Sequence, residues 1–300
     1  MAGGLDTTGL DTTRRTAAER VTDRLRAIPV EGGLGTRVSR LDADGGQLRL
    51  PIPPGPDGDP DGVALTVALN VLADVAGGVA VSMCAGRGLG SPTIELRIDH
   101  LAPPAPDAGW LIADSTVPHH AAGAGYAAVV VHDDRDRAVA HAHGHFAVTT
   151  PETALGEPPP MDRTTDGTDG IAPHRPDALL ATLAAVVTPS GPGDDPADWS
   201  LTCGPELSNP RGQVQGGVAM AIGQLAQRRA QAPDLSDGAE LRPLTVHAEY
   251  LRPAPIDGTE LRCRTEYVRR GRRFRTLRTE LVRADGRVAT IVTGLWAAAS

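Results

Sequence analysis

The most strongly apolar pattern in the chain lies at residues 63–81 and has the spacing of a helix. It predicts a long, largely buried helix, because one stripe carries Leu65, Leu69, Leu72, Ala76 and Val79. Residues 93–100 then alternate with period two, which predicts a strand with Ile94, Leu96, Ile98 and His100 on one face and Thr93, Glu95, Arg97 and Asp99 on the other. Three further strands are predicted at 110–117, 125–132 and 138–148. The first half therefore predicts one long helix followed by an antiparallel sheet.

Two weaker patterns precede this unit. Residues 16–28 predict a short helix, and residues 35–50 alternate around a turn at 44–46, which is typical of a hairpin.

The second half repeats the first at a shift of 150 residues. The shift aligns Leu101-Ala102-Pro103 with Leu251-Arg252-Pro253, and it aligns Gly144 and Phe146 with Gly294 and Trp296. Because the register holds without a gap through helix and strands together, it indicates a duplicated domain. We predict an N-terminal arm and short helix at 1–29, domains at 30–150 and 176–300, and a linker rich in Pro, Gly, Thr and Asp at 151–175.

The second-half helix is preceded by a loop of Asn, Pro, Gly and Gln at residues 209–217. Gly216-Gly217 marks the helix start, because apolar positions then follow at Val218, Ala221, Ile222 and Leu225. A helix start offers free backbone N–H groups and a partial positive charge, and glycines allow a ligand to come close. The segment could therefore bind a carbonyl oxygen that becomes negatively charged during a reaction.

The doubled helix-plus-sheet pattern, the Gln215-Gly216-Gly217 start and the strand ending in Leu-Arg-Pro resemble the hotdog-fold acyl-CoA thioesterases of the phenylacetate-degradation (PaaI-like) type. The resemblance covers residues 30–150 and 175–300. It implies an α+β tandem hotdog, in which each repeat wraps an antiparallel sheet around a long helix.

The same resemblance implies one composite site. The family motif is Asn-x-x-Gly-x-x-His-Gly-Gly, with a catalytic Asp eight positions after the first Gly of the pair. The second half has Gln215 in the His position but Gln224 in the Asp position. The first half has Asp74 at the Asp position but Leu65-Thr66-Val67 in place of His-Gly-Gly. Family sites take their Asp and their Gly-Gly start from different units, so Asp74 is expected to complete the second-half loop, and Gln224 with Thr66-Val67 leaves a degenerate site.

Each residue of the composite site has an expected role in thioester hydrolysis. Asp74 would act as general base or nucleophile, Gly216 and Gly217 would offer N–H groups to the thioester oxygen, and Gln215 and Asn209 would orient water or carbonyl. Asp74 lies in a mostly apolar helical row, where a carboxylate is costly unless it is solvated, paired or used. An ordinary interface hydrogen bond for Asp74 and plain turn roles for Asn209 and the glycines remain the alternatives.

The arginines, the net charge and the histidines change this interpretation little. Arg270, Arg272 and Arg273 could bind the phosphates of coenzyme A, although such a run is more often a solvated surface. The net charge of -8 and the 3 % aromatic content do not favour nucleic-acid binding. His141, His143 and His145 alternate as metal ligands can, but no carboxylate follows nearby, so no metal and no bound cofactor is expected.

Three scattered cysteines and the lack of a run of roughly 18 apolar residues predict a cytoplasmic protein. The expected partner is an acyl-CoA substrate, without nucleic acid or membrane, and exposed sheet edges allow a homodimer of the fused pair. Two alternatives stay open: a non-catalytic acyl-CoA-binding or scaffold protein, suggested by Gln215 and Gln224, and a hotdog hydratase or dehydratase. The latter needs a His near the helix start, and residues 51–99 and 175–246 contain none.

Overall fold

The computed structural model describes residues 16–52, 62–85, 91–121, 123–148, 177–187, 195–235 and 240–299. The predicted linker at 151–175 lies outside these residues, so the domain boundaries stay predictions.

In the described residues, the first unit has three helices and six strands. Its elements are α1 (Ala17–Arg26), α2 (Pro29–Leu34), β1 (Arg37–Leu41), β2 (Gly45–Pro51), α3 (Val63–Cys84), β3 (Thr93–His100), β4 (Trp110–Ala121), β5 (Ala124–Asp133) and β6 (Ala138–Ala147). The short N-terminal helix, the β1–β2 hairpin and the long helix followed by strands occur where the sequence predicts them.

The second unit repeats the order of one strand, a long helix and four further strands. Its elements are α4 (Asp177–Val187), β7 (Asp198–Thr202), the 3-10 turn η2 (Pro205–Leu207), α5 (Gly216–Gln231), the 3-10 turn η3 (Ala232–Asp234), β8 (Glu240–Tyr250), β9 (Glu260–Arg270), β10 (Phe274–Val282) and β11 (Val288–Ala299).

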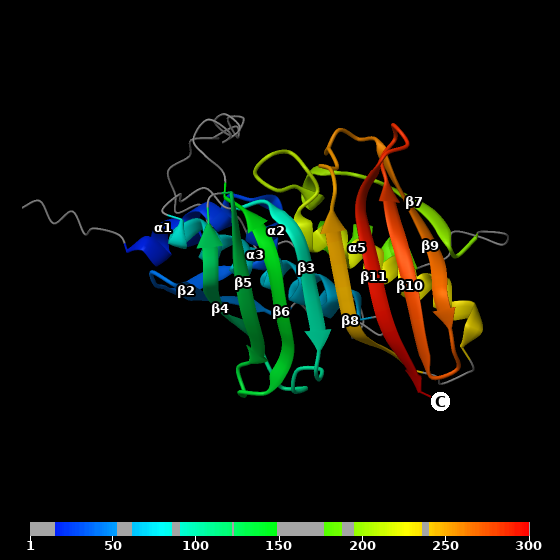
Figure 1. Cartoon of the computed structure of the whole chain (residues 1–300), viewed down its shortest axis with the longest axis horizontal. Coiled ribbons are helices and arrows are strands. Elements are labelled where there is room, and N and C mark those ends of the chain that lie inside the picture. Colours follow the sequence, from blue (N-terminus) through cyan, green and yellow to red (C-terminus); the bar gives the residue numbers. More distant parts are fainter. Residues whose placement is uncertain are drawn as a thin grey trace, which may run out of the picture.

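The eleven strands that the structure describes join one sheet in the order β1-β2-β4-β5-β6-β3-β8-β11-β10-β9-β7. The two units lie side by side in it, with β3 and β8 adjacent at the centre, as Figure 1 shows. The order of the second unit mirrors that of the first about this seam, and β3 pairs with β8 antiparallel from Glu95↔Glu249 to Asp99↔Thr245. The α3 and α5 helices contact each other and the sheet.

Individual hydrogen bonds repeat at the same shift. The Leu101 N–H donates to the Val139 carbonyl at 2.9 Å, and the Leu251 N–H donates to the Ala289 carbonyl at 2.8 Å. The predicted α+β tandem hotdog is confirmed.

Helix α3 is the central helix of the first unit's core. By length and composition it could cross a membrane, which corrects the prediction that no such run exists, but 89 % of its most apolar 18-residue window is buried inside the protein. Burial against strands and α5 accounts for its apolar composition.

The start of α5 lies very close to α3. A Cβ on Gly217 would lie 2.5 Å from the Asn70 carbonyl oxygen and 2.6 Å from the Val71 Cα. Only a residue without a side chain fits this approach, so Gly217 sets how deeply α5 packs on α3.

A β-bulge in β3 changes the predicted strand faces. Thr93 pairs with Phe146 and Glu95 with His145, so Ile94 is an extra residue. The bulge turns the Thr93 side chain inward onto α3 and leaves Ile94 43 % exposed, whereas Leu96 and Ile98 are buried as predicted. The period-two prediction was therefore wrong at Thr93 and Ile94, because it assumes an unbroken strand.

Candidate active site

The start of α5 is held by its own loop. Asn209 Oδ1 accepts hydrogen bonds from the Arg211 N–H at 2.8 Å and the Gln213 N–H at 3.2 Å, and Gly212 takes a positive φ of 66° in the same turn. The Gln215 N–H then donates to the Leu207 carbonyl at 2.9 Å. Asn209 thus shapes the loop through its side-chain oxygen, and the loop fixes the position of Gln215.

Gln215 is the N-cap of α5 and is almost fully buried. Its side-chain Oε1 accepts from the Val218 N–H at 2.8 Å, and its Nε2 donates to Asp74 Oδ2 at 2.8 Å. One amide group therefore caps the second unit's helix and binds a carboxylate of the first unit.

Asp74 lies on α3 at the start of α5, with 7 % of its surface exposed. Thr93 Oγ1 donates to Asp74 Oδ1 at 2.6 Å, and the Gly217 N–H also faces the carboxylate. A Cβ on Gly216 would lie 2.8 Å from Asp74 Oδ2, so the carboxylate rests against this glycine. The structure brings Asp74, Gln215, Gly216 and Gly217 together across the two units.

Opposing effects set the proton affinity of Asp74. Burial raises its pKa from 3.8 to about 6, while the bonds from Thr93, the Gly217 N–H and Gln215 lower it. The carboxylate is ionised at neutral pH yet basic enough to take a proton from a reacting group.

Two further residues, Thr93 and Tyr250, contact the cluster of Asp74, Gln215, Gly216 and Gly217 but are not part of the family motif. Thr93 reaches Asp74 only through the bulge. Tyr250, the last residue of β8, donates from its hydroxyl to the Gly216 carbonyl at 2.8 Å, and burial raises its pKa well above 10, with the Asp74 charge adding to the rise. The alternating pattern of a strand gives no sign of a bulge, so Thr93 could not have been found from the sequence. Tyr250 could have been found, because it lies at the end of the strand that precedes Leu251-Arg252-Pro253.

One N–H in the first turn of α5 has no hydrogen-bond partner among the described residues. Gln215 takes the Val218 N–H and Asp74 takes that of Gly217. Within the described ranges no acceptor lies at the Gly216 N–H, and Gly216 is partly exposed. The N–H at the positive end of α5 can therefore meet an oxygen beside Asp74.

The pseudo-symmetric position is built differently. Gln224 Oε1 accepts from Asn70 Nδ2 at 2.9 Å, and both side chains are buried. The amide pair joins α3 to α5, and Gln224 supplies no basic carboxylate.

Arg270 of the run Arg270, Arg272 and Arg273 lies near the C-terminal end of α5. Arg270 pairs with Asp234 of η3, which directly follows the C-terminus of α5, and its guanidinium lies 5.0 Å from the Tyr267 ring centroid. A 16-residue helix is about 24 Å long. The structure does not bring Arg270, Arg272 and Arg273 to Asp74, so their role toward coenzyme A phosphates stays a prediction.

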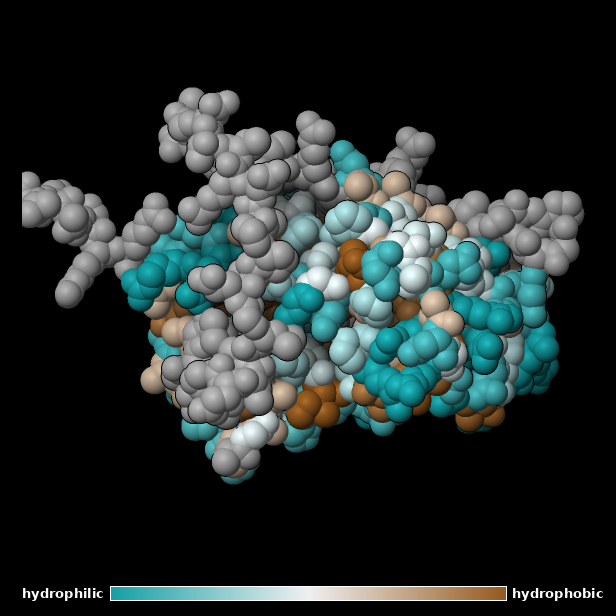
Figure 2. Space-filling view, turned by 90° about the horizontal axis from the view of Figure 1, so that it is seen from above, coloured by the Kyte–Doolittle hydropathy of each residue, from teal (hydrophilic) through white to brown (hydrophobic). Residues whose placement is uncertain are grey.

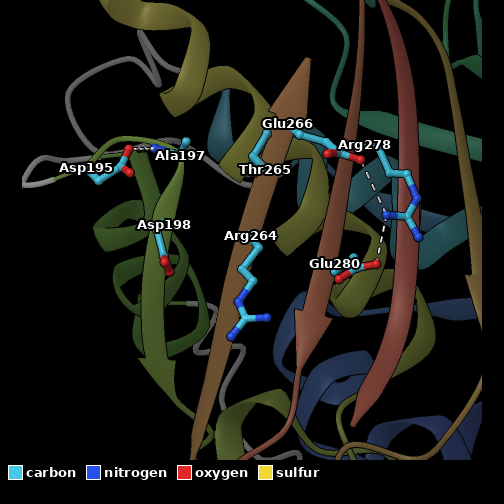
Figure 3. Close-up of a pocket in the computed structure, with 8 residues that line it drawn as sticks. All are labelled: Asp195, Ala197, Asp198, Arg264, Thr265, Glu266, Arg278 and Glu280. Atoms are coloured by element: carbon cyan, nitrogen blue, oxygen red, sulfur yellow. Dashed lines mark hydrogen bonds and ion pairs between the residues drawn. The ribbon is translucent and has the colours of Figure 1, made fainter. Parts of the chain in front are cut away.

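The other polar groupings lie on the outer face of the sheet. Figure 3 shows a hollow over β7, β9 and β10 where Arg278 lies between Glu266 and Glu280, at 3.6 and 2.8 Å. At the seam, Glu95 binds His145 at 2.7 Å and His247 at 3.0 Å, so polar side chains pair with one another in both clusters. Within the described residues, no group of three or more His, Cys, Asp or Glu is arranged to hold a metal ion. Seen from above, the second unit is mostly hydrophilic (Figure 2).

Comparison with known proteins shows a similarity to one family over part of the chain. Residues 205–297 match the family model of the acyl-CoA thioesterase N-terminal domain. Most of the second hotdog unit is therefore similar to an acyl-CoA thioesterase domain. The matched range contains the start of α5, Gln215 and Tyr250.

Solved structures show that the fold extends over both units. The tesB protein of Mycobacterium avium subsp. paratuberculosis is similar at a TM-score of 0.53 and 9 % identity, over 93 % of this chain and 99 % of that one. The acyl-CoA thioesterase II TesB2 of Mycobacterium marinum is similar at a TM-score of 0.50 and 10 % identity, over 91 % and 97 %. A search of curated proteins found no match. The predicted resemblance to hotdog acyl-CoA thioesterases, as a fused double hotdog, is confirmed.

Proposed function

We propose that this thioesterase-domain protein hydrolyses acyl-CoA to a free acid and coenzyme A at one composite site, formed by Asp74 of the first unit and the start of α5 in the second. The observation that carries the proposal is the position of Asp74. A buried carboxylate with a pKa of about 6 lies beside a partly exposed helix N-terminus. A general base and a donor for an oxyanion are what thioester hydrolysis requires.

In the proposed reaction Asp74 takes a proton from a water molecule, and the oxygen of that water bonds to the thioester carbon. The carbonyl oxygen becomes negative and accepts from the Gly216 N–H at the positive end of α5. The intermediate then collapses, the carbon–sulfur bond breaks, and the proton on Asp74 passes to the leaving thiolate. Direct attack by Asp74 with an acyl-enzyme anhydride is the alternative role for the same carboxylate.

The two other predicted functions are less well supported. Among the described groups that bind Asp74 there is no histidine, which a hydratase would use as its acid/base partner. A protein that only binds acyl-CoA does not need the raised pKa of Asp74. The amide of Gln224, which replaces a carboxylate at the degenerate position, is the feature consistent with such a protein. The cytoplasmic location, the lack of a bound cofactor and a homodimer stay predictions.

Thiol release from acyl-CoA tests the proposal. The protein is incubated with aliphatic acyl-CoAs of increasing length and with an aromatic acyl-CoA, and free thiol is measured against time. Turnover of at least one substrate is expected. Stoichiometric binding without thiol release from any of them would favour the non-catalytic alternative.

Removing the Thr93 hydroxyl is expected to change the pH dependence of this hydrolysis. A hydrogen bond to the ionised form lowers a pKa, so Thr93→Val should raise the pKa of Asp74 above about 6. We expect the acid limb of kcat/KM to move up by about one pH unit, since hydrogen bonds to charged groups contribute about 1.5–3 kcal/mol.

Thr245→Val is the matched control, because Thr245 Oγ1 donates to Asp99 Oδ1 at 2.8 Å on the outer face of the same seam. Its pH profile should equal that of the wild type. An unmoved acid limb in Thr93→Val, or an equal movement in both variants, would contradict the role given to Thr93.

A further inference from the structure

Tyr250 joins the central part of the sheet to the start of α5. It is the last residue of β8 and pairs with Thr290 of β11, and the N–H of the next residue, Leu251, donates to the Ala289 carbonyl at 2.8 Å. Its backbone is therefore held in the sheet. From this position the Tyr250 hydroxyl donates to the Gly216 carbonyl at 2.8 Å. A residue of the sheet thus holds the first residue of the helix.

The carbonyl that accepts this bond belongs to a peptide group that also borders Asp74. Because a trans peptide group is planar, the Gly216 carbonyl and the Gly217 N–H point in opposite directions from one rigid unit. The Gly217 N–H faces the Asp74 carboxylate, and a Cβ on Gly216 would lie 2.8 Å from Asp74 Oδ2. The tyrosine hydroxyl therefore holds one end of a unit whose other end meets the carboxylate. A bond to the carbonyl also polarises the N–H of the same unit.

The β3–β8 seam supplies one hydroxyl to each part of the composite site. On β3, Thr93 donates to the carboxylate at 2.6 Å, and on β8, Tyr250 donates to the helix start. Both residues lie at the end of the seam where Glu95 pairs with Glu249. The two central strands therefore hold the two halves of the site from one place in the sheet.

The pseudo-symmetric position lacks the tyrosine hydroxyl. The shift of 150 residues aligns Tyr250 with His100, the last residue of β3. Burial lowers the pKa of His100 to about 4, so its ring is neutral at pH 7, and its buried Nε2 has no hydrogen-bond partner in the part of the chain that the structure describes. Of the two related positions, the one with the carboxylate is also the one with the hydroxyl.

We propose that Tyr250 is a positioning residue of the composite site, whose hydroxyl fixes the Gly216–Gly217 peptide group so that the start of α5 meets Asp74 in one orientation. This inference rests on the proposed function, since the orientation matters to catalysis only if Asp74 and the Gly216 N–H act on the thioester. Burial raises the pKa of Tyr250 well above 10, and the Asp74 charge adds to the rise. The hydroxyl therefore keeps its proton and stays a donor at neutral pH.

The test is Tyr250→Phe in the full chain, which keeps the ring and removes the hydroxyl. We expect kcat at neutral pH to fall about tenfold, since a lost hydrogen bond of about 1.4 kcal/mol corresponds to a factor of ten. KM should stay unchanged, because the loss acts on groups that stabilise the transition state. The acid limb of kcat/KM should move to higher pH, but by less than in Thr93→Val, because Tyr250 acts on the carboxylate only through the peptide group.

The other carboxyl groups near Asp74 would not produce such a movement. Burial raises the pKa of Glu31 of α2 to about 8, so Glu31 stays neutral through the acid limb. Glu95 of β3 is partly buried, yet hydrogen bonds from neighbouring histidines hold its pKa below the usual value, so it stays ionised. A moved acid limb would therefore report on Asp74.

Tyr267→Phe is the matched control, because the Tyr267 hydroxyl donates to Asp234 Oδ2 at 2.6 Å beyond the C-terminus of α5. It loses the same atom at the other end of the same helix. Its kcat and pH profile should equal those of the wild type, with thermal unfolding as a check on folding in both variants. Equal losses of kcat in the two variants, or a Tyr250→Phe protein with wild-type kcat and acid limb, would overturn the inference.

A ¹³C titration of the aspartate side-chain carboxyls provides a readout without turnover. The Asp74 resonance, assigned by its absence from Asp74→Asn, should titrate near pH 6 in the wild type and at higher pH in Tyr250→Phe. Equal midpoints in these two proteins would contradict the inference. A wild type that releases no thiol would refute the proposed function, whereas the two midpoints would still decide whether Tyr250 acts on Asp74.

Discussion

Asp74→Asn is expected to lower kcat for acyl-CoA hydrolysis by at least about 10²-fold, the usual loss when a general base is removed. Asparagine keeps the size of the side chain and can still accept from Thr93, so the fold around α3 should persist. It cannot take a proton from water at neutral pH. The measurement is thiol release at saturating acyl-CoA, with thermal unfolding as a check on folding.

Gln224→Ala is the control at the pseudo-symmetric position. It leaves the buried Asn70 amide without its partner, so the melting temperature should fall, but kcat of the folded protein should stay near that of the wild type. An equal loss of kcat in both variants would contradict the single-site account.

Gly217→Ala is expected to have the largest effect on stability. The new Cβ would meet backbone atoms of Asn70 and Val71 at 2.5–2.6 Å, which no side-chain rotation can relieve. The two helices would have to move apart, at about 2–3 kcal/mol in the free energy of unfolding, the upper part of the range for overpacking. Activity should fall too, because Asp74 would withdraw from the start of α5. Denaturant unfolding and thiol release measure the two effects.

Gly78→Ala offers a comparison within α3, where the nearest atom to the added Cβ, the Ser91 carbonyl oxygen, is at 3.2 Å. Its change in unfolding free energy should stay within about 1 kcal/mol, since improved helix propensity offsets the tight contact. A Gly217→Ala protein as stable and active as Gly78→Ala would show that the close approach of the helices is not needed.

The fold could be predicted because the spacing of apolar residues along the sequence indicates its helices and strands. Helical spacing at 63–81 and the repeat at 150 residues define one long helix and a sheet, twice over. The pairing of Asp74 with the Gln215 loop was implied by the family resemblance, because each half lacks a part of the family motif that the other half has. The structure places these residues in contact.

The remaining site residues depend on tertiary features that a sequence pattern does not contain. Thr93 points to Asp74 because of one inserted residue in β3, which reverses the predicted face.

The central claim is that one site per chain combines Asp74 with the start of α5. Its most direct test is a crystal structure of the Asp74→Asn variant with an acyl-CoA that the wild type hydrolyses. We predict one intact acyl-CoA per chain, with its thioester carbonyl oxygen within hydrogen-bond distance of the Gly216 N–H and its carbonyl carbon facing residue 74. A thioester bound instead between Gln224 and Thr66, or equal occupancy of both positions, would contradict the account.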